Sequence, residues 1–392
     1  MTIDPATLTG NWNYPTAIRF GPGRITELAE ACKSLGMTKP LLVTDPGLAG
    51  LPMVADALAA NQAAGLPTGL FSDVKPNPVG KNVDDGIAAY RDGGHDGVIA
   101  WGGGSGLDAA KAVALMAGQS RPLWDFEDRG DNWLRADPAG IAPIVAVPTT
   151  AGTGSEVGRA SVILDESDHT KKIVFHPKML PSIVISDPEL TVGLPAHITA
   201  ATGMDALAHC LEAYCAPGYH PMAEGIAVEG MRLIKEWLPT AVADGANLEA
   251  RAHMLVAASM GATAFQKGLG AIHSLSHPVG ALYDTHHGLT NAVVMPYVLQ
   301  YNRPAIEDQL VRLAAWLGLP EPSFQAVMDW VLGLRRDLEI PHTLAELGVS
   351  DERLDEMSVM AARDPTAGSN PIPVGAAELK TLFTAAIEGR LS

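Results

Sequence analysis

The sequence changes its pattern near residue 190, and this change constrains the fold more than any other feature. Before residue 190, short β-branched and apolar runs alternate with alanine-rich stretches such as 83–91 and 107–117. The runs lie at 41–44, 97–101, 143–147 and 182–186. Alternating strand and helix signals are typical of a parallel sheet with helices on both faces. We therefore expect an α/β domain of the nucleotide-binding type over residues 1–190.

Beyond residue 190 the strand signals end and the sequence becomes rich in Ala, Leu and Met. Apolar residues recur there at three-to-four spacing, which predicts helices. The predicted helices lie at 199–215, 222–238, 249–266, 289–300, 305–317, 322–337 and 376–388. We expect an all-α domain over residues 191–392.

The composition limits the kind of partner. The chain has 392 residues, 47% of them hydrophobic, and a formal net charge of −17. Nucleic acid and anionic membrane surfaces would repel such a charge. The chain also lacks the long apolar run that a membrane-spanning helix needs. We expect a small-molecule substrate, with no nucleic acid and no membrane as partner.

Cysteine usage and the N-terminal sequence favour a cytoplasmic location. The three cysteines, Cys32, Cys210 and Cys215, form no CxxC pair. The first fifteen residues lack the basic and apolar regions of a secretory signal. Both features are typical of a reducing compartment. Cys210 projects about 100° away from His209 around the helix, so we expect a packed core thiol there.

A glycine-rich loop follows one of the predicted strands. Residues 102–108, GGGSGLD, come directly after the strand 98–101 and open the helix 109–116. Glycines let the backbone approach a pyrophosphate, and the free N–H groups at the helix start attract its charge. The loop therefore predicts a phosphate cradle, although a bare GGGS turn can also be purely structural.

Two more polar segments follow predicted strands. Asp45 comes after the strand 41–44, where a carboxylate can bind an adenosine ribose and repel a 2′-phosphate, which favours NAD over NADP. An alternative is an ordinary turn aspartate in the sequence 45–47. The turn 148–156, PTTAGTGSE, follows the strand ending at Val147. Polar groups at the carboxyl ends of parallel strands suit contact with a ligand.

A carboxylate and an imidazole stand four residues apart in a predicted helix. Asp205 and His209 share one helix face, so both can reach a single ion while later histidines complete its shell. An alternative is that they form, with Glu212, the solvated stripe of an amphipathic helix. A dense histidine cluster further along favours the metal site. Its members are His273, His277, His286 and His287.

Four motifs together resemble those of the iron-containing, or group III, alcohol dehydrogenases. They are GGGSGLDAAKA (102–112), PTTAGTGSEV (148–157), TAATGMDALAHCLEAY (199–214) and GLGAIHSLSHPVGALYDTHHG (268–288). The resemblance implies a dinucleotide-binding domain with a parallel sheet and an all-α metal-binding domain, the architecture also found in dehydroquinate synthases. It implies an enzyme that transfers a hydride between NAD and a small alcohol or aldehyde.

The resemblance also implies the metal ligands. Matched motif by motif, ferrous iron would be held by Asp205, His209, His273 and His287. His286 is not matched, because the family's last ligand immediately precedes a glycine, here Gly288. The ligands alone leave the metal open, since three imidazoles and a carboxylate suit Zn(II) as well as Fe(II) and intrinsic affinity favours zinc.

His277 matches a further histidine that lies close to the metal in the family. A histidine one turn from a ligand can relay the proton of the alcohol to solvent, because its pKa lies near neutrality. Alternatively, His277 orients a ligand by a hydrogen bond.

The cofactor contacts follow from the same resemblance. The positions that match the NAD contacts are Asp45, Asn77, Gly103, Gly104, Ser105, Asp108, Thr149, Thr150, Thr153 and Lys172. One departure is Gly106, where the family often has proline, whose fixed φ suits a helix start.

Two cationic residues depart from the commoner family pattern. Arg159 follows the 148–157 motif, and Lys267 precedes the segment that carries His273. A cationic pair can hold a carboxylate by charge-assisted hydrogen bonds. The stretch AFQKGLG resembles the 4-hydroxybutyrate dehydrogenase branch, so we hypothesise a short ω-hydroxy acid and its semialdehyde as substrates. Alternatively, Lys267 contacts an NAD phosphate or a helix C-terminus, and Arg159 pairs with Glu156 or Asp165.

Other classes share this architecture. Dehydroquinate synthases are lyases that use NAD and a metal, and glycerol dehydrogenases use zinc. The spacing of Asp205, His209, His273 and His287 favours the alcohol dehydrogenases over both. The family suggests a homodimer or a larger homo-oligomer, in which the strand 16–20 can pair across a two-fold axis.

Overall fold

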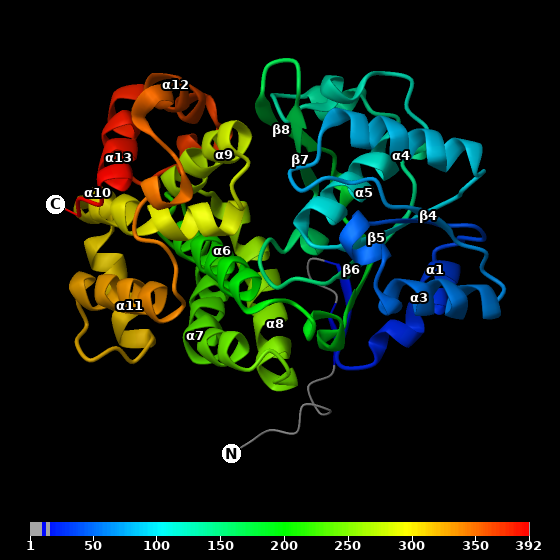
Figure 1. The fold of residues 1–392 in the computed structure, drawn as a ribbon, viewed down its shortest axis with the longest axis horizontal. Helices are drawn as coiled ribbons and strands as arrows, with labels where there is room; N and C mark the ends of the chain where they lie inside the picture. The colour runs from blue at the N-terminus through cyan, green and yellow to red at the C-terminus, as the bar shows by residue number, and fades with distance from the viewer. Residues whose placement is uncertain (1–9, 13–15, 392) are drawn as a thin grey trace. The chain divides into compact units, whose positions relative to one another are not determined.

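The computed structural model describes residues 10–12 and 16–391 of the chain. The chain divides into two compact units, one up to Gly193 and one from Leu194 onward, each with its own architecture (Figure 1). The expectation about a secretory signal concerns the first fifteen residues, and of these residues 1–9 and 13–15 lie outside the described residues.

The first unit is built on a seven-stranded sheet. In spatial order its strands are β1 (Gly10–Trp12), β2 (Ala17–Phe20), β9 (Ile183–Ser186), β6 (Ile144–Pro148), β5 (Val98–Gly102), β3 (Leu41–Val43) and β4 (Gly69–Phe71). All neighbours are parallel except β1, which pairs antiparallel with β2. The predicted parallel sheet is therefore confirmed, and the four predicted strands all belong to it.

The central strands β3, β5 and β6 are buried on both faces, which explains why they are apolar throughout. Leu42, Ile99 and Val145 point toward a core shared with the helices α1 (Leu28–Ser34) and α3 (Pro52–Ala63). The helices α4 (Gly80–Asp92) and α5 (Gly104–Met116) lie on the other side of the sheet (Figure 1). Parallel strands covered on both faces need no polar alternation.

Some strand features differ from expectation. The antiparallel pair β7 (Ala160–Asp165) and β8 (Thr170–Phe175) and the short strand β4 were not predicted. The strand expected to pair across a two-fold axis is β2, but β2 lies between β1 and β9, so both its edges already carry ladder partners. The outermost described strand on that side is β1.

The second unit is helical, and none of its described residues forms a strand. Its helices are α6 (Ala196–Cys215), α7 (Pro221–Ala243), α8 (Leu248–Ala264), α9 (Ala271–Tyr283), α10 (His287–Trp316), α11 (Phe324–Asp337), α12 (Leu354–Arg363) and α13 (Ala376–Glu388). Helices α9 and α12 were not predicted. No helix among the described residues is both long and apolar enough to cross a membrane.

The prediction of two helices at 289–300 and 305–317 was wrong, because α10 runs unbroken through both Pro296 and Pro304. Proline removes a backbone donor and usually kinks or ends a helix. The segment around Pro296 is buried, so packing against neighbouring helices outweighs the local cost of the missing hydrogen bond.

Helix α10 begins in close contact with α6, and a glycine makes this possible. A Cβ atom added at Gly288 would lie 2.4 Å from the carbonyl oxygen of Ala201 and 2.9 Å from Cβ of Asp205. The backbone oxygen cannot move aside as a flexible side chain can. Only glycine therefore allows the residue next to His287 to pack on the helix turn that carries Asp205.

We expect Gly288→Ala to lower the free energy of unfolding by roughly 1–3 kcal/mol, because the added methyl group forces α10 away from α6. Urea unfolding of the purified variant measures this. Gly225→Ala is the matched control, since Gly225 is an exposed residue of α7 with open space at its Cβ position. It should raise stability by up to about 1 kcal/mol through helix propensity. Equal effects of the two substitutions would contradict the close approach.

Candidate functional site

Helix α6 is buried around its whole circumference, including its polar face. Asp205, His209 and Glu212 are only 2%, 4% and 7% exposed, and the apolar residues between them are equally enclosed. The alternative of a solvated amphipathic stripe is therefore wrong. Buried polar groups need polar partners, so the polar face of α6 must meet other polar side chains inside the protein.

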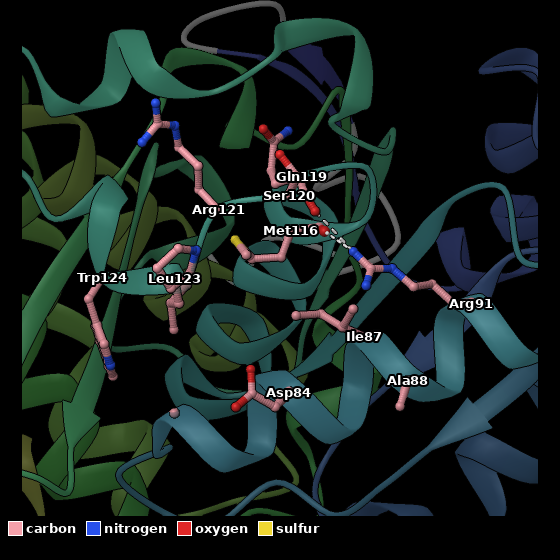
Figure 2. Close-up of a pocket in the computed structure, with 12 residues that line it drawn as sticks. Asp84, Ile87, Ala88, Arg91, Met116, Gln119, Ser120, Arg121, Leu123 and Trp124 are labelled. Atoms are coloured by element: carbon pink, nitrogen blue, oxygen red, sulfur yellow. Dashed lines mark hydrogen bonds between the residues drawn. The ribbon is translucent and has the colours of Figure 1, made fainter.

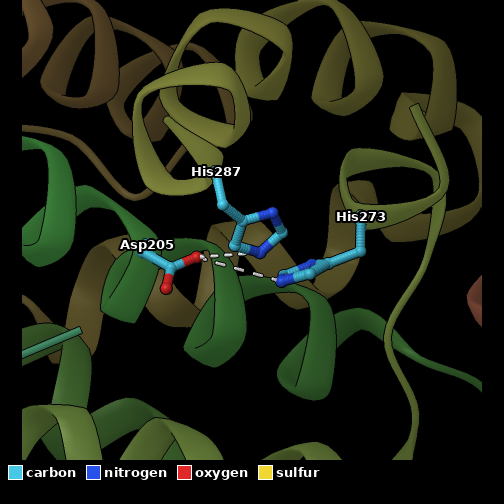
Figure 3. Close-up of side chains that lie close together, drawn as sticks. All are labelled: Asp205, His273 and His287. Atoms are coloured by element: carbon cyan, nitrogen blue, oxygen red, sulfur yellow. Dashed lines mark ion pairs between the residues drawn. The ribbon is translucent and has the colours of Figure 1, made fainter. Parts of the chain in front are cut away.

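Three imidazoles surround one carboxylate oxygen. The Nε2 atoms of His209, His273 and His287 lie 3.9, 4.0 and 3.6 Å from Oδ1 of Asp205. Asp205, His273 and His287 form the tightest group, with one ligand atom from each within 4.8 Å of the others (Figure 3). Two ligands of a tetrahedral Zn(II)-like ion lie roughly 3.3–3.5 Å apart. The donor set and its spacing therefore fit a divalent metal with modest contraction.

His209 lies beside this group without belonging to its tightest part. Its ring stacks on that of His273, with centroids 4.8 Å apart and planes 18° from parallel, and it also contacts the Phe265 ring, whose centroid lies 5.1 Å away. The i and i+4 spacing on α6 thus brings His209 to the same carboxylate oxygen as the two histidines from α9 and α10.

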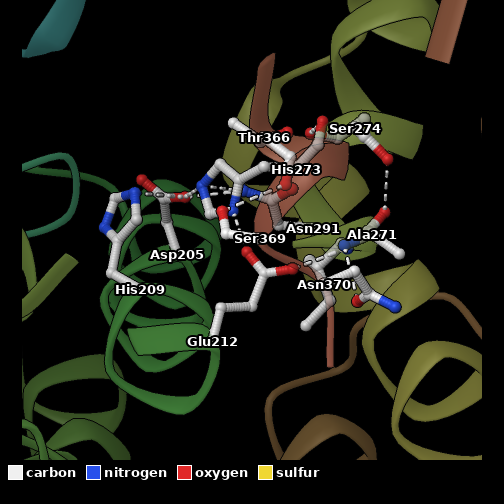
Figure 4. Close-up of polar contacts among 12 residues, drawn as sticks. Asp205, His209, Glu212, Ala271, His273, Ser274, Asn291, Thr366, Ser369 and Asn370 are labelled. Atoms are coloured by element: carbon white, nitrogen blue, oxygen red, sulfur yellow. Dashed lines mark hydrogen bonds and ion pairs between the residues drawn. The ribbon is translucent and has the colours of Figure 1, made fainter. Parts of the chain in front are cut away.

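Glu212 fixes His273 and the start of α9 together. Its Oε2 lies 2.5 Å from Nδ1 of His273, and its Oε1 accepts the backbone N–H of Ile272 at 2.7 Å (Figure 4). The neighbouring N–H of Ala271 donates to Asn370 Oδ1. A carboxylate at Nδ1 holds the proton there and leaves the Nε2 lone pair directed at Asp205. Glu212 was predicted only as part of a polar helix face.

The electrostatics of His273 suit binding of a cation. Burial alone would lower the pKa of the His273 imidazole, but the carboxylates of Glu212 and Asp205 raise that pKa above its usual range. The site therefore attracts positive charge to His273. A metal ion supplies such charge, and its binding then competes with protons.

His277 lies against the same group and has a carboxylate of its own. Its ring stacks on His287 with centroids 5.4 Å apart, and its Nδ1 lies 2.7 Å from Oδ2 of Asp364. Asp364 also accepts the backbone N–H and hydroxyl of Thr366. Burial alone would raise the pKa of Asp364, but His277 and Thr366 hold it below its usual range. Asp364 was not predicted, because nothing local marks a carboxylate 87 residues from its partner.

In the first unit, the glycine loop packs on the threonine turn. The chain passes from β5 through Gly102, whose φ is +140°, into α5, which begins at Gly104 without a side-chain cap. Cβ atoms added at Gly103 and Gly104 would lie 3.1 Å and 2.5 Å from side-chain atoms of Thr150 and Thr153. The predicted residues Gly103, Gly104, Ser105, Thr150 and Thr153 are therefore neighbours, and the uncapped helix start fits an anion.

Gly106 is required by its surroundings. A Cβ atom there would lie 2.9 Å from the carbonyl oxygen of Trp101. Gly106, where the family often has proline, thus lies at a close contact between the first turn of α5 and the end of β5.

Asp45 and Thr149 lie where the loop begins. Asp45 caps the short helix α2 (Pro46–Ala49), accepting the N–H of Leu48 through Oδ1, while its Oδ2 lies near Gly102. The turn interpretation and the ribose-binding interpretation are therefore compatible, since the second oxygen faces the loop. Thr149 is 3% exposed, and its N–H donates to the carbonyl of Gly102.

The remaining predicted cofactor residues have partners within the first unit. Asp108 accepts the hydroxyl of Ser155 and the N–H of Val162, and lies 3.2 Å from the buried Lys111 ammonium. Asn77 accepts a hydrogen bond from Lys171. Lys172 of β8 pairs with Asp165 of β7 and with Asp168 in the turn between the two strands. These contacts shape the loops; they leave the cofactor roles as predictions.

The two proposed substrate cations differ in their environments. The Lys267 side chain is 2% exposed, and its ammonium lies 2.8 Å from Glu224 and donates to the carbonyl of Tyr214 in the last turn of α6. Lys267 therefore contacts a helix C-terminus, as the alternative interpretation expected. Arg159 is exposed, with its guanidinium 5.7 Å from the centre of the Phe175 ring. It forms no ion pair with a described carboxylate.

A hollow of about 490 Å³ in the first unit lies away from all these residues. It is lined by α4, the end of α5 and the segment 119–124 (Figure 2). The guanidinium of Arg91 is occupied by the carbonyls of Met116, Ala117 and Gln119, and Arg121 pairs with Asp125. No predicted site residue lines this hollow, so we assign it no role.

Two family models and several known proteins match the chain over most of its length. Residues 15–188 match the family described as iron-containing alcohol dehydrogenase, and residues 199–387 match its C-terminal domain. The chain is 40% identical to a 4-hydroxybutyrate dehydrogenase of Cupriavidus necator over 94% of this chain and 98% of that protein. It is 36% identical to an NAD-dependent methanol dehydrogenase of Bacillus methanolicus, over 92% and 95% of the two chains.

The fold is also similar to that of a solved structure. The crystal structure of a 1,3-propanediol oxidoreductase matches with a TM-score of 0.89 and 36% sequence identity. The match covers 94% of this chain and 97% of that chain.

We expect Glu212→Gln to weaken metal binding about 10–100-fold. Glutamine keeps an oxygen for the N–H of Ile272 but presents an amide donor to Nδ1 of His273, which disfavours the tautomer with a free Nε2 lone pair. Competition with a chromophoric chelator measures the dissociation constant. The control is Glu236→Gln, an exposed residue of α7 paired with Arg232. An unchanged dissociation constant in Glu212→Gln would contradict the role of this carboxylate.

We expect Asp364→Asn to change how stability depends on pH. The folded-state pKa of Asp364 is lowered, so its charge stabilises the fold above the unfolded pKa of about 3.9 and this contribution is lost as pH falls below that value. The variant should be less stable than the wild type at pH 7 and lose less stability between pH 5 and 3. Urea unfolding across this range tests it. Asp355→Asn, at a highly exposed aspartate, is the control.

Proposed function

This chain belongs to the iron-containing alcohol dehydrogenase family, and from that premise we propose that it transfers a hydride between NAD(H) and a small primary alcohol or its aldehyde. We propose that a divalent metal is held by Asp205, His209, His273 and His287. The observation that carries the proposal is the convergence of three imidazole Nε2 atoms on one buried carboxylate oxygen. An ion that takes five or six ligands would keep a position for an alcohol oxygen beside these three nitrogens and one oxygen.

The bound metal would supply Lewis acidity at the alcohol oxygen and NAD would accept the hydride. The chain's own residues prepare these groups. Glu212 holds His273 with its lone pair inward, and Gly288 lets α10 bring His287 to Asp205. The backbone N–H groups at the start of α5 would bind the pyrophosphate, and Oδ2 of Asp45 would accept a ribose hydroxyl.

We propose His277 as the proton relay. Its Nδ1 lies at hydrogen-bond distance from the buried Asp364 carboxylate, which holds the ring in one orientation. Nε2 is then the atom that takes the proton from the alcohol and later releases it to solvent. The same contacts support the alternative of an orienting role, since His277 also stacks on His287.

We propose Fe(II) as the resident metal, following the family, with Zn(II) as the alternative that the ligand set would bind more tightly. We also propose a cytoplasmic protein that forms a homodimer or a larger homo-oligomer. All three cysteines are buried and unpaired, and burial raises their pKa values to about 12, as suits thiols that serve only in packing.

For the substrate we propose a short ω-hydroxy acid and its semialdehyde, such as 4-hydroxybutyrate and succinic semialdehyde. The relative at 40% identity supports this choice, although other relatives are named for methanol and propanediol. Arg159 is the better candidate for binding the substrate carboxylate. To bind a substrate carboxylate, Lys267 would have to break its ion pair with Glu224 and its hydrogen bond to the last turn of α6.

The test is steady-state reduction of succinic semialdehyde and butanal by chelator-stripped protein reloaded separately with Fe(II) or Zn(II), followed by NADH absorbance. We expect metal-dependent turnover with a higher kcat/KM for the semialdehyde. Turnover that favours butanal would keep the enzyme class and overturn the anionic substrate. The absence of turnover with either metal would contradict the dehydrogenase activity itself.

Two variants separate the cations in the same assay. Arg159→Met should raise KM for succinic semialdehyde at least about tenfold and leave butanal unaffected, because it removes a charge-assisted hydrogen bond. Lys267→Met should affect both aldehydes alike and lower stability, because it leaves Glu224 and the helix end without their partner. Equal effects of Arg159→Met on the two aldehydes would contradict its role.

A further inference from the structure

The amide of Asn291 lies among the proposed metal ligands. Asn291 is one turn after His287 in α10 and is completely buried. Its Nδ2 donates to Oδ1 of Asp205 at 2.8 Å and lies 3.1 Å from Nε2 of His287 and 3.3 Å from Nε2 of His273. Figure 4 shows the Asn291 side chain beside Asp205 and His273. One amide nitrogen thus contacts three of the four atoms that would bind the ion.

These contacts use the same lone pairs that a metal needs. A neutral imidazole with its proton on Nδ1 has a single lone pair, on Nε2. When the His273 ring is neutral, the Glu212 carboxylate keeps its proton on Nδ1. A lone pair that accepts an N–H bond cannot also bind a cation. One hydrogen of the amide is bound by Oδ1 of Asp205, which has a second lone pair for an ion, and the other hydrogen competes with the ion for the Nε2 lone pairs of His273 and His287.

The oxygen of the Asn291 amide shows that the amide is held with its nitrogen toward Asp205, His273 and His287. Oδ1 of Asn291 is buried and has no hydrogen-bond partner among the described residues. A rotation of the amide by about 180° would exchange Nδ2 and Oδ1. The amide oxygen would then face Oδ1 of Asp205 and the Nε2 lone pairs of His273 and His287, which repel it. Three acceptors around one donor group therefore fix the orientation, at the expense of an unsatisfied oxygen.

We propose that Asn291 is a positioning residue that competes with the metal for its ligands. It stabilises the ligand set before the metal binds, and it moderates the affinity of the site. The inference rests on the proposed metal site but not on the reaction that the site performs.

The principal test is Asn291→Ala, compared with the wild type as chelator-stripped and Zn(II)-loaded protein. Thermal unfolding should show the stripped variant melting roughly 3–10 °C below the stripped wild type, because three buried acceptors lose their donor. The Zn(II)-loaded proteins should melt at similar temperatures. The dissociation constant for Zn(II), measured by chelator competition, should fall about tenfold or more.

A second variant keeps the volume of the side chain. Asn291→Asp removes the donor hydrogens and sets a carboxylate against the ligands, so the stripped form should be less stable still and bind Zn(II) more tightly. The control is Asn302→Ala, because Asn302 is also a buried amide of α10 but pairs with Asn370 instead of the ligands. It should lower the melting temperature of both forms alike and leave the dissociation constant unchanged.

The inference is overturned if Asn291→Ala behaves like Asn302→Ala, or if both Asn291 variants bind Zn(II) no more tightly than the wild type does. Such results with normal wild-type binding would leave the proposed function intact. A wild-type protein that binds neither Zn(II) nor Fe(II) would overturn the metal site and this inference together.

Discussion

The second unit depends on the burial of one carboxylate. Asp205 is 2% exposed in the middle of a helix that is itself buried on all sides. A buried charge is tolerated only when other groups compensate it. Three histidines and an asparagine from three helices meet this requirement. The packing of α6, α9 and α10 therefore brings the polar groups that compensate this carboxylate into contact with it. Gly288 makes the close approach of α10 to α6 possible.

Two histidines at the site are each held by a carboxylate. Glu212 lies behind His273 and Asp364 behind His277, so two anionic side chains fix the rings from the side away from Asp205. The histidines are thus oriented by hydrogen bonds as well as by packing. Such support is typical of sites whose geometry matters for chemistry.

The sequence predicted the elements and residues that depend on local spacing. The i and i+4 pair Asp205 and His209, the strand before the glycine loop and the division into α/β and α halves all follow from period and composition. What it did not predict depends on contacts between distant segments. The roles of Glu212, Asn291 and Asp364 need the tertiary structure, as does the continuity of α10 through its prolines. One local signal was available, since Asn291 is four residues after His287 and shares its helix face.

The contacts at the start of α9 affect the order in which the two units can fold during synthesis. Its first N–H groups donate to Glu212 and Asn370, and His277 contacts Asp364, so the proposed metal site depends on residues late in the chain. A chain emerging from the ribosome can complete the sheet unit long before these residues appear. The sheet unit can therefore fold first during translation, while the helical unit matures only after residues 364–370 have been synthesised.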